Sequence, residues 1–98
     1  MATYIVLCNF TDQGIRNVKE SPKRAEAFKD LAKKTGATVK ELYWTVGQYD
    51  AVTVVEAPDD QTITALLLAA GSLGNIRTQT LRAYSADEIA RIIAKIPK

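Results

Sequence analysis

The chain has 98 residues, of which 47% are hydrophobic and 24% are charged, a composition that fits one globular domain and excludes a disordered segment. Thirteen basic and eleven acidic residues leave a formal net charge of +2, which argues against binding to nucleic acid or to an anionic membrane. The sequence contains no histidine, which excludes Ser-His-Asp triads, Cys-His pairs, histidine-ligated haem and zinc sites that need histidine.

Cysteine usage and hydropathy indicate the compartment. Cys8 is the single cysteine, so it cannot form an internal disulfide, and its apolar neighbours predict a small buried hydrophobe. The longest apolar run, from Ala65 to Ala70, is far shorter than the ~20 residues that cross a bilayer, and no secretory signal is visible. We therefore expect a cytoplasmic protein without a membrane partner.

The first third of the chain predicts a strand followed by an interrupted helix. Residues Thr3 to Phe10 are rich in β-branched and aromatic types, and both faces are apolar, as in a central strand. A helical spacing begins near Ile15 and continues to Gly36, which predicts a C-terminal cap. Pro22 interrupts the spacing, so we expect a kink or a restart there, with Ser21 as the cap.

The middle of the chain predicts a β-hairpin. Residues Thr38 to Val46 alternate, with Leu42, Trp44 and Val46 on one face and Glu41, Tyr43 and Thr45 on the other. The turn Gly47-Gln48-Tyr49-Asp50 leads to a returning strand over Ala51 to Ala57.

The last part predicts a helix, a strand and a second helix. Asp59 and Asp60 begin a helix that continues to about Leu73, with Gly74 as its cap. Residues Asn75 to Tyr84 predict a fourth strand. Ser85 and Glu88 have the spacing of a capping box, and the helix after them carries an apolar stripe of four isoleucines, Ile89, Ile92, Ile93 and Ile96.

The predicted order is β-α-β-β-α-β-α, without a linker or a repeat, so residues 1–98 form one domain. Two β-α-β units joined by a hairpin predict an α+β, ferredoxin-like βαββαβ fold. Its four-stranded antiparallel sheet has two helices on one face, and the C-terminal helix is an addition.

The second long helix predicts a partner. Residues 62–74 carry no charge; Ile63, Leu66, Leu67, Ala70 and Leu73 should meet the sheet, which leaves Ala65, Leu68 and Ala69 on the other side. Either the isoleucine-rich last helix or another subunit should cover them. The alternative is that a lone exposed Leu68 needs no cover.

Strand parity predicts one polar face of the sheet, which makes it a candidate ligand site. It carries Glu41, Tyr43 and Thr45 on the second strand, Glu56 on the third, Thr78, Thr80, Arg82 and Tyr84 on the fourth, and Tyr4 can join it. If another subunit covers that face, a partly polar cavity results. The candidate binding residues are Tyr43, Tyr49, Asp50, Glu56, Arg77 and Arg82, with Glu56 and Arg82 as the main polar anchors and Arg77 on the opposite parity, where it can serve an interface.

Each of these features also has a plain structural interpretation. A solvated antiparallel sheet explains the polar face, core packing explains Tyr43, Trp44 and Tyr49, and turn formation explains Asp50. Helix capping explains Asp59 and Asp60, and no spacing typical of a metal site or a phosphate-binding loop is present, so we expect no metal and no cofactor. The basic residues between Arg16 and Lys40 alternate with acids, which predicts a solvated helix face.

Three blocks of sequence resemble the GYD-domain family over nearly the whole chain. They are TYIVLCNFTDQGIRNVKESPKRAEAF, VKELYWTVGQYDAVTVVEAPDD and GNIRTQTLRAYSADEIARI, and the family's signature corresponds to Gly47, Tyr49 and Asp50. The resemblance implies a ferredoxin-like fold of the dimeric α/β-barrel type. It implies no particular reaction, and no catalytic residue can be carried over.

Three functional hypotheses follow. The first is a homo-oligomer that binds a small molecule between the sheet and its covering subunit or helices. The second is a cofactor-independent enzyme, similar to a monooxygenase or an isomerase, in which a tyrosine or glutamate transfers a proton and an arginine stabilises an anion. The third is a structural or regulatory assembly module without a small ligand.

Overall fold

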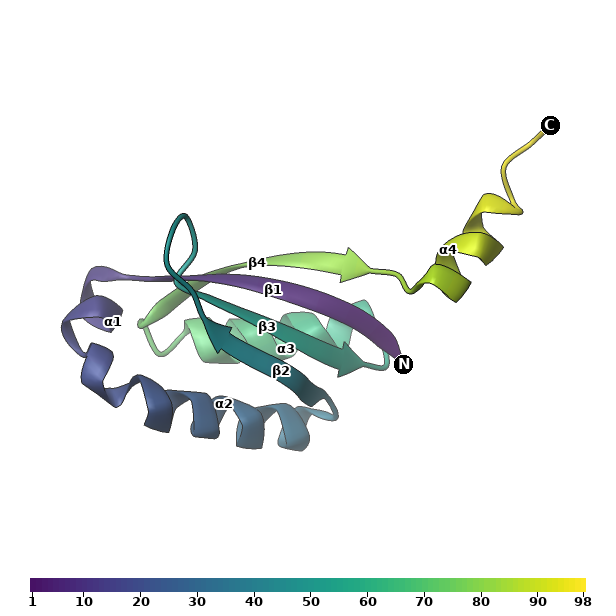
Figure 1. The fold of residues 1–98 in the computed structure, drawn as a ribbon. Helices are drawn as coiled ribbons and strands as arrows, with labels where there is room; N and C mark the ends of the chain where they lie inside the picture. The colour runs from purple at the N-terminus through teal and green to yellow at the C-terminus, as the bar shows by residue number, and fades with distance from the viewer.

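The computed structural model describes residues 1–98 and has the predicted ferredoxin-like order of elements (Figure 1). The elements are β1 (Ala2–Phe10), α1 (Asp12–Arg16), the 3₁₀ turn η1 (Val18–Glu20), α2 (Ser21–Thr35), β2 (Thr38–Trp44), β3 (Ala51–Ala57), α3 (Asp60–Gly71), β4 (Ile76–Ala83) and α4 (Ala86–Ile93). No helix combines the length and the apolar character that crossing a bilayer requires.

The expected helix boundaries are largely confirmed. The chain restarts as α2 at the predicted position, although Ser21 is the first helical residue rather than the cap. Gly36 ends α2 with a φ of 101°, which a glycine adopts without strain. Asp59 caps α3 by accepting the backbone N–H of Thr62. The hydrogen bond from the Thr62 hydroxyl, together with this backbone hydrogen bond, lowers the pKa of the Asp59 carboxyl.

The four strands form one antiparallel sheet in the order β2-β3-β1-β4, so β1 and β3 are central. Both α2 and α3 lie on the same side of it (Figure 1). The core between these layers combines Tyr4, Val6, Val55 and Ala57 from the sheet with Ala32, Ala37, Ile63, Leu66 and Leu67 from the helices and the turn after α2. We call this side of the sheet the helix face and the other side the open face.

A β-bulge at Lys40 sets which side chains of β2 reach the core. Val39 pairs with Val55, and Glu41 pairs with Val54, so one extra residue separates the two pairs. Val39 and Leu42 therefore both lie on the helix face, which strict alternation would not allow.

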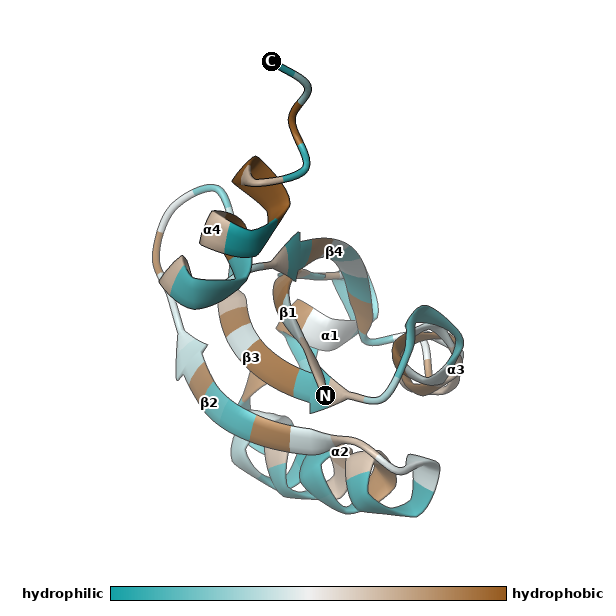
Figure 2. Ribbon diagram, turned by 90° about the vertical axis from the view of Figure 1, so that its right-hand side faces the viewer, coloured by the Kyte–Doolittle hydropathy of each residue, from teal (hydrophilic) through white to brown (hydrophobic).

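The last helix does not cover the outer side of α3, which was one of the two expected arrangements. The capping box is confirmed: Ser85 and Glu88 exchange hydrogen bonds, and the backbone N–H of Ser85 lowers the pKa of the Glu88 carboxyl. However, α4 projects away from the sheet and the other helices (Figures 1 and 2). The radius of gyration is 14.9 Å, compared with about 13 Å for a compact domain of this length. The apolar stripe of α4 is exposed.

Nothing within the chain covers the outer side of α3. Leu68 is 69% exposed. Leu73, which we expected to meet the sheet, is 67% exposed because the helix ends at Gly71 and the chain turns away. The four residues expected to face the sheet before this point, from Ile63 to Ala70, are buried as predicted.

The contact between α1 and the segment before β4 requires a glycine. A Cβ at Gly14 would overlap the backbone of Asn75, whose carbonyl accepts the N–H of Thr11, whereas a Cβ at Gly71 would meet nothing within 4 Å. We expect Gly14→Ala to lower the free energy of unfolding by ~1–3 kcal/mol and Gly71→Ala to leave it unchanged or raise it by up to ~1 kcal/mol. Urea denaturation measures both, and equal stability of the two variants would contradict the close approach.

Candidate functional site

The open face of the sheet has an apolar centre with polar side chains around it. Ile5 of β1 lies between Val54 of β3 and Leu81 of β4, and Leu7 lies next to Val52. Glu41, Tyr43, Glu56, Arg77 and Gln79 have the same parity and lie around these residues. Three of the six candidate residues, Tyr43, Glu56 and Arg77, therefore lie on this face.

The prediction that Arg82 lies on the same face of the sheet as Glu56 is wrong. In β4, Arg82 lies opposite Tyr4, and Thr80 lies opposite Val6, so Thr78, Thr80 and Arg82 belong to the helix face. Arg77, which we had placed on the opposite parity to Arg82, is the arginine of the open face. The predicted alternation of side chains within β4 is correct. The register of β4 with β1 decides which of the two alternating sets of side chains faces the helices. The Glu56 carboxylate instead lies 4.0 Å from Lys40 Nζ at the surface.

Arg82 connects the sheet to the last helix. Its Nη1 donates to the carbonyl of Thr3 at 3.2 Å and to that of Ala83, and its Nη2 lies 3.7 Å from the Glu88 carboxylate in the first turn of α4. The guanidinium carbon lies 4.4 Å from the ring centroid of Tyr84 and 5.6 Å from that of Tyr4. These contacts fix the start of α4 relative to β1 and β4.

Tyr49 and Asp50 hold the hairpin loop against the sheet. The Tyr49 hydroxyl donates to Gln79 Oε1 at 3.2 Å, which connects the loop to β4. The Asp50 carboxylate accepts the backbone N–H of Phe10 at 2.8 Å, and the Asp50 N–H donates to the carbonyl of Cys8. Asp50 thus extends the pairing of β1 and β3 by one residue, in agreement with the structural interpretation of this carboxylate.

The aromatic residues of β2 lie at the surface on opposite faces, so packing of both in the core is wrong. Tyr43 is 57% exposed on the open face, and its hydroxyl donates to Glu41 Oε2 at 2.8 Å, which raises the pKa of the Tyr43 hydroxyl. Trp44 is half exposed on the helix face, at the edge of a pocket.

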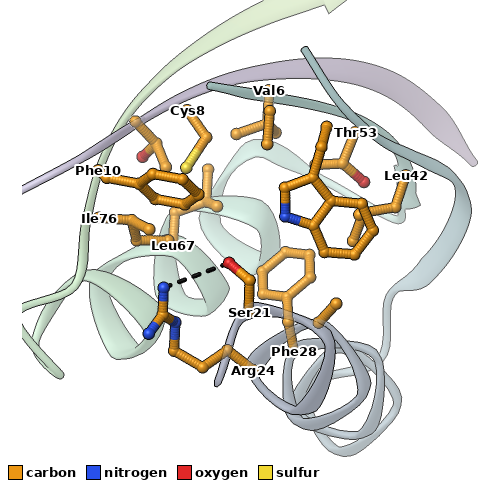
Figure 3. A pocket seen from close by; sticks show the side chains of 14 residues that line it. Val6, Cys8, Phe10, Ser21, Arg24, Phe28, Leu42, Thr53, Leu67 and Ile76 are labelled. Atoms are coloured by element: carbon orange, nitrogen blue, oxygen red, sulfur yellow. Dashed lines mark hydrogen bonds between the residues drawn. The ribbon is translucent and has the colours of Figure 1, made fainter. Parts of the chain in front are cut away.

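That pocket lies between the sheet and the start of α2 (Figure 3) and was missed in the sequence analysis. Cys8 points into it from β1, and Ser21, Arg24 and Phe28 from α2 (Figure 3). Ten of its fourteen lining residues are hydrophobic, and its volume is about 90 Å³. The full lining consists of Val6, Cys8, Phe10, Ser21, Arg24, Ala25, Phe28, Leu42, Trp44, Ala51, Thr53, Leu67, Ile76 and Thr78.

Of two pocket residues, Cys8 has the surroundings predicted from the sequence, whereas Arg24 does not. Burial raises the pKa of the Cys8 thiol to about 11, so the thiol stays protonated at neutral pH, as expected of a buried hydrophobe. Arg24 was expected on a solvated helix face, yet it is half-buried, 5.8 Å from the ring centroid of Phe10. Neighbouring basic residues fit the expectation better, because Lys23 and Lys29 form surface ion pairs with Glu20 and Glu26.

The chain belongs to the GYD domain family, whose model matches residues 4–93. It is 39% identical, over 94 residues, to the glutamine synthetase and cystathionine beta-lyase binding protein of Thermus thermophilus, an alignment that covers 94% of this chain and 99% of that protein. The family expected from the sequence is thereby confirmed.

Solved structures share the fold. A crystal structure of a Thermus thermophilus protein is 26% identical, with a TM-score of 0.57 over 88% of this chain and 96% of that one. The leucine response regulatory protein of Mycobacterium tuberculosis is 18% identical, with a TM-score of 0.65 over 87% of this chain. A feast or famine regulatory protein from M. tuberculosis, complexed with L-methionine, is 19% identical, with a TM-score of 0.64 over 88%. This chain spans about half the length of those two regulators (51% and 54%), and the likeness shows the fold alone.

Tyr4 should make stability depend on alkaline pH. Burial and the 2.5 Å hydrogen bond to Asp60 raise the pKa of the Tyr4 hydroxyl from 10.0 to about 12. The folded state therefore retains this proton longer than the unfolded state, so its stabilising effect is complete below about pH 10 and is lost as the pH rises to about 12.

We expect Tyr4→Phe to flatten the fall of the free energy of unfolding between about pH 10 and 12, although it also removes a hydrogen bond and lowers stability at neutral pH. Tyr84→Phe, which removes an exposed hydroxyl, is the control and should keep the wild-type profile. Denaturation at a series of pH values measures both, and unchanged pH dependence in Tyr4→Phe would contradict the assignment.

Proposed function

We propose that this protein is a self-associating binding module whose assembled form holds other proteins. The observation that carries this proposal is that the protomer leaves two apolar surfaces without cover, the open face of the sheet and the isoleucine stripe of α4. The sequence relationship supports it, because the relative at 39% identity is named for binding two enzymes.

The size of the core supports self-association. Only 14 of the 98 residues are buried, so many apolar side chains keep much of their surface in water when the protomer folds alone. At the centre of the open face, Ile5, Leu7, Val52 and Val54 are only half-buried, and Leu81 is exposed. Monomeric proteins rarely leave a continuous apolar patch of this kind exposed.

The start of α4 explains why the two surfaces do not cover each other within one chain. Only Tyr84 and Ser85 separate β4 from α4, and Arg82 holds the first turn of α4 through Glu88. The helix is thereby directed away from its own sheet (Figure 1). A second copy related by a two-fold axis supplies a matching open face and a second helix at once, as isologous interfaces do.

The outer side of α3 is the part of the surface that we assign to protein partners. Exposed Leu68 and Leu73 lie on the side of the molecule opposite the open face, so self-association through the open face leaves them accessible. Self-association multiplies the copies of this surface, which strengthens binding to oligomeric enzymes through avidity.

The expected cytoplasmic location remains a prediction, which the single buried free cysteine supports.

A charge at the centre of the open face tests this function. We expect Leu81→Lys to convert the wild-type oligomer to monomers, because Leu81 lies opposite Ile5 on the open face and a lysine covered there would have no carboxylate opposite it. Ala27→Lys adds the same charge at an exposed position of α2 and should keep the oligomer. Light scattering gives the mass in solution. Co-elution with purified glutamine synthetase and cystathionine beta-lyase gives partner binding, which should weaken at least about tenfold in Leu81→Lys through loss of avidity. A monomeric wild-type protein that binds neither enzyme would overturn the proposal.

A second candidate function is binding of a small molecule within the self-association interface. It is supported by the position of Tyr43, Glu56 and Arg77 on the open face, and of the Tyr49 hydroxyl beside Gln79 of the same face. A covering subunit would enclose hydroxyl, carboxylate and guanidinium groups around an apolar centre, which is the usual character of a ligand pocket.

Mass spectrometry of the intact oligomer tests this second function. We expect a small molecule to be retained by the wild-type protein and lost in Arg77→Gln and in Glu56→Gln. Arg16→Gln, on exposed α1, removes a positive charge outside the open face and should retain the molecule. Retention in all variants, or in none including the wild type, would count against a site on the open face.

A further inference from the structure

We propose that the pocket between α2 and the helix face binds a small organic anion, with its carboxylate at Arg24 and its apolar part against Phe28 and Trp44. This site lies within one protomer, on the other side of the sheet from the self-association surface, and does not depend on the function proposed above.

The pocket is a partly open cleft between the strands and α2. About 90 Å³ is free there, whereas closely packed side chains leave few voids larger than a water molecule. A second hollow of about 140 Å³ shares Arg24, Phe28 and Ile76 with the first, so Arg24 and Phe28 form a wall common to both. The walls are mainly apolar, and an apolar ligand part would gain from leaving water.

Arg24 provides the charged end of the pocket. Its Nη1 donates to the carbonyl of Asn17 at 2.9 Å, and its Nη2 donates to the carbonyl of Gly14 at 3.1 Å and to Ser21 Oγ at 3.3 Å. All three acceptors are neutral, and Arg24 forms no ion pair. Charges taken out of water are normally paired, and Arg24 is partly buried with neutral acceptors alone, so its guanidinium favours an anion from outside the chain.

The other polar groups at the pocket do not change the preference of Arg24 for an anion. The Asp50 carboxylate accepts the backbone N–H of Phe10, and Asp50 does not line the pocket. The Cys8 thiol is protonated because burial raises its pKa, and Thr53 donates its hydroxyl to the carbonyl of Glu41. Arg24 is therefore the only charged group that lines the pocket.

The volume limits the class of ligand. A dry cavity of about 150 Å³ holds one benzene molecule. The pocket of about 90 Å³ is smaller, but it is partly open, and the hollow of about 140 Å³ adjoins it at Arg24 and Phe28, so the space suits a short aliphatic or single-ring carboxylate rather than a nucleotide or a cofactor. The carboxylate can accept the guanidinium N–H groups that the three neutral acceptors leave free.

Trp44 supplies the signal for the test, because it is the only tryptophan and lines the pocket. The probes are hexanoate and phenylacetate, with hexanamide and phenylacetamide as uncharged counterparts. We expect each carboxylate to change the fluorescence of Trp44 saturably and to bind about tenfold more tightly than its amide, the size of effect that a charge-assisted hydrogen bond gives.

Two variants and one control locate the binding. Ala25→Leu fills the pocket from α2 and should weaken both probes of each pair at least about tenfold, whereas Ala90→Leu adds the same group on exposed α4 and should change neither. Arg24→Gln should remove the preference for the carboxylate. Because Arg24 also holds the carbonyls of Gly14 and Asn17, circular dichroism and thermal unfolding must show that this variant folds, and Arg24→Lys tests the charge if it does not.

Three results would overturn the proposal. They are no saturable change in the wild-type protein with either carboxylate, equal affinity for the carboxylate and the amide, and unchanged affinity in Ala25→Leu. The first excludes a ligand of this class, the second excludes recognition of the charge by Arg24, and the third places the binding elsewhere on the protein.

Discussion

The central constraint on this protein is that a four-stranded sheet with apolar residues on both faces has helices on only one of them. In β1, Tyr4 and Val6 are buried beneath the helices, whereas Ile5 and Leu7 point to the other side and are only half-buried. Each square ångström of apolar surface removed from water contributes about 25 cal/mol, so covering the open face with another molecule would stabilise the complex. The core of the protomer is small and one face of the sheet is exposed for the same reason, namely that the helices cover only one face.

The projecting last helix follows from local interactions rather than from flexibility. The capping box at Ser85 begins α4 immediately after β4, and Arg82 joins β1, β4 and the first turn of α4 through hydrogen bonds, an ion pair and two aromatic rings. Arg82, which we expected to anchor a ligand, therefore has a structural role. Its contacts set the direction in which α4 leaves the sheet, and with it the place where the isoleucine stripe can meet a second copy.

Features that depend on neighbouring residues could be predicted from the sequence, whereas features that depend on strand register could not. Gly36, Asp59 and the Ser85 capping box act within a few residues, and their caps lie where the sequence indicates. The orientation of β4 depends on Arg82 pairing with Tyr4, residues far apart in the chain, so alternation within β4 left two possibilities of which we chose the wrong one. Arg24 illustrates the same limit, since the charge pattern of α2 does not show that one arginine packs over Phe10.

Successive residues of a strand point to opposite faces of the sheet, so neighbouring residues of β1 face two different surfaces. Leu7 faces the surface assigned to self-association, and Cys8, the next residue, faces the pocket beside Arg24. The two surfaces are nonetheless connected mechanically, because Asp50 links the hairpin loop to the backbone of β1 at Phe10, whose side chain lines the pocket. The same loop bonds β4 through Tyr49 and Gln79 on the open face. The hairpin loop therefore contacts both the strand that carries Phe10 and the open face of β4.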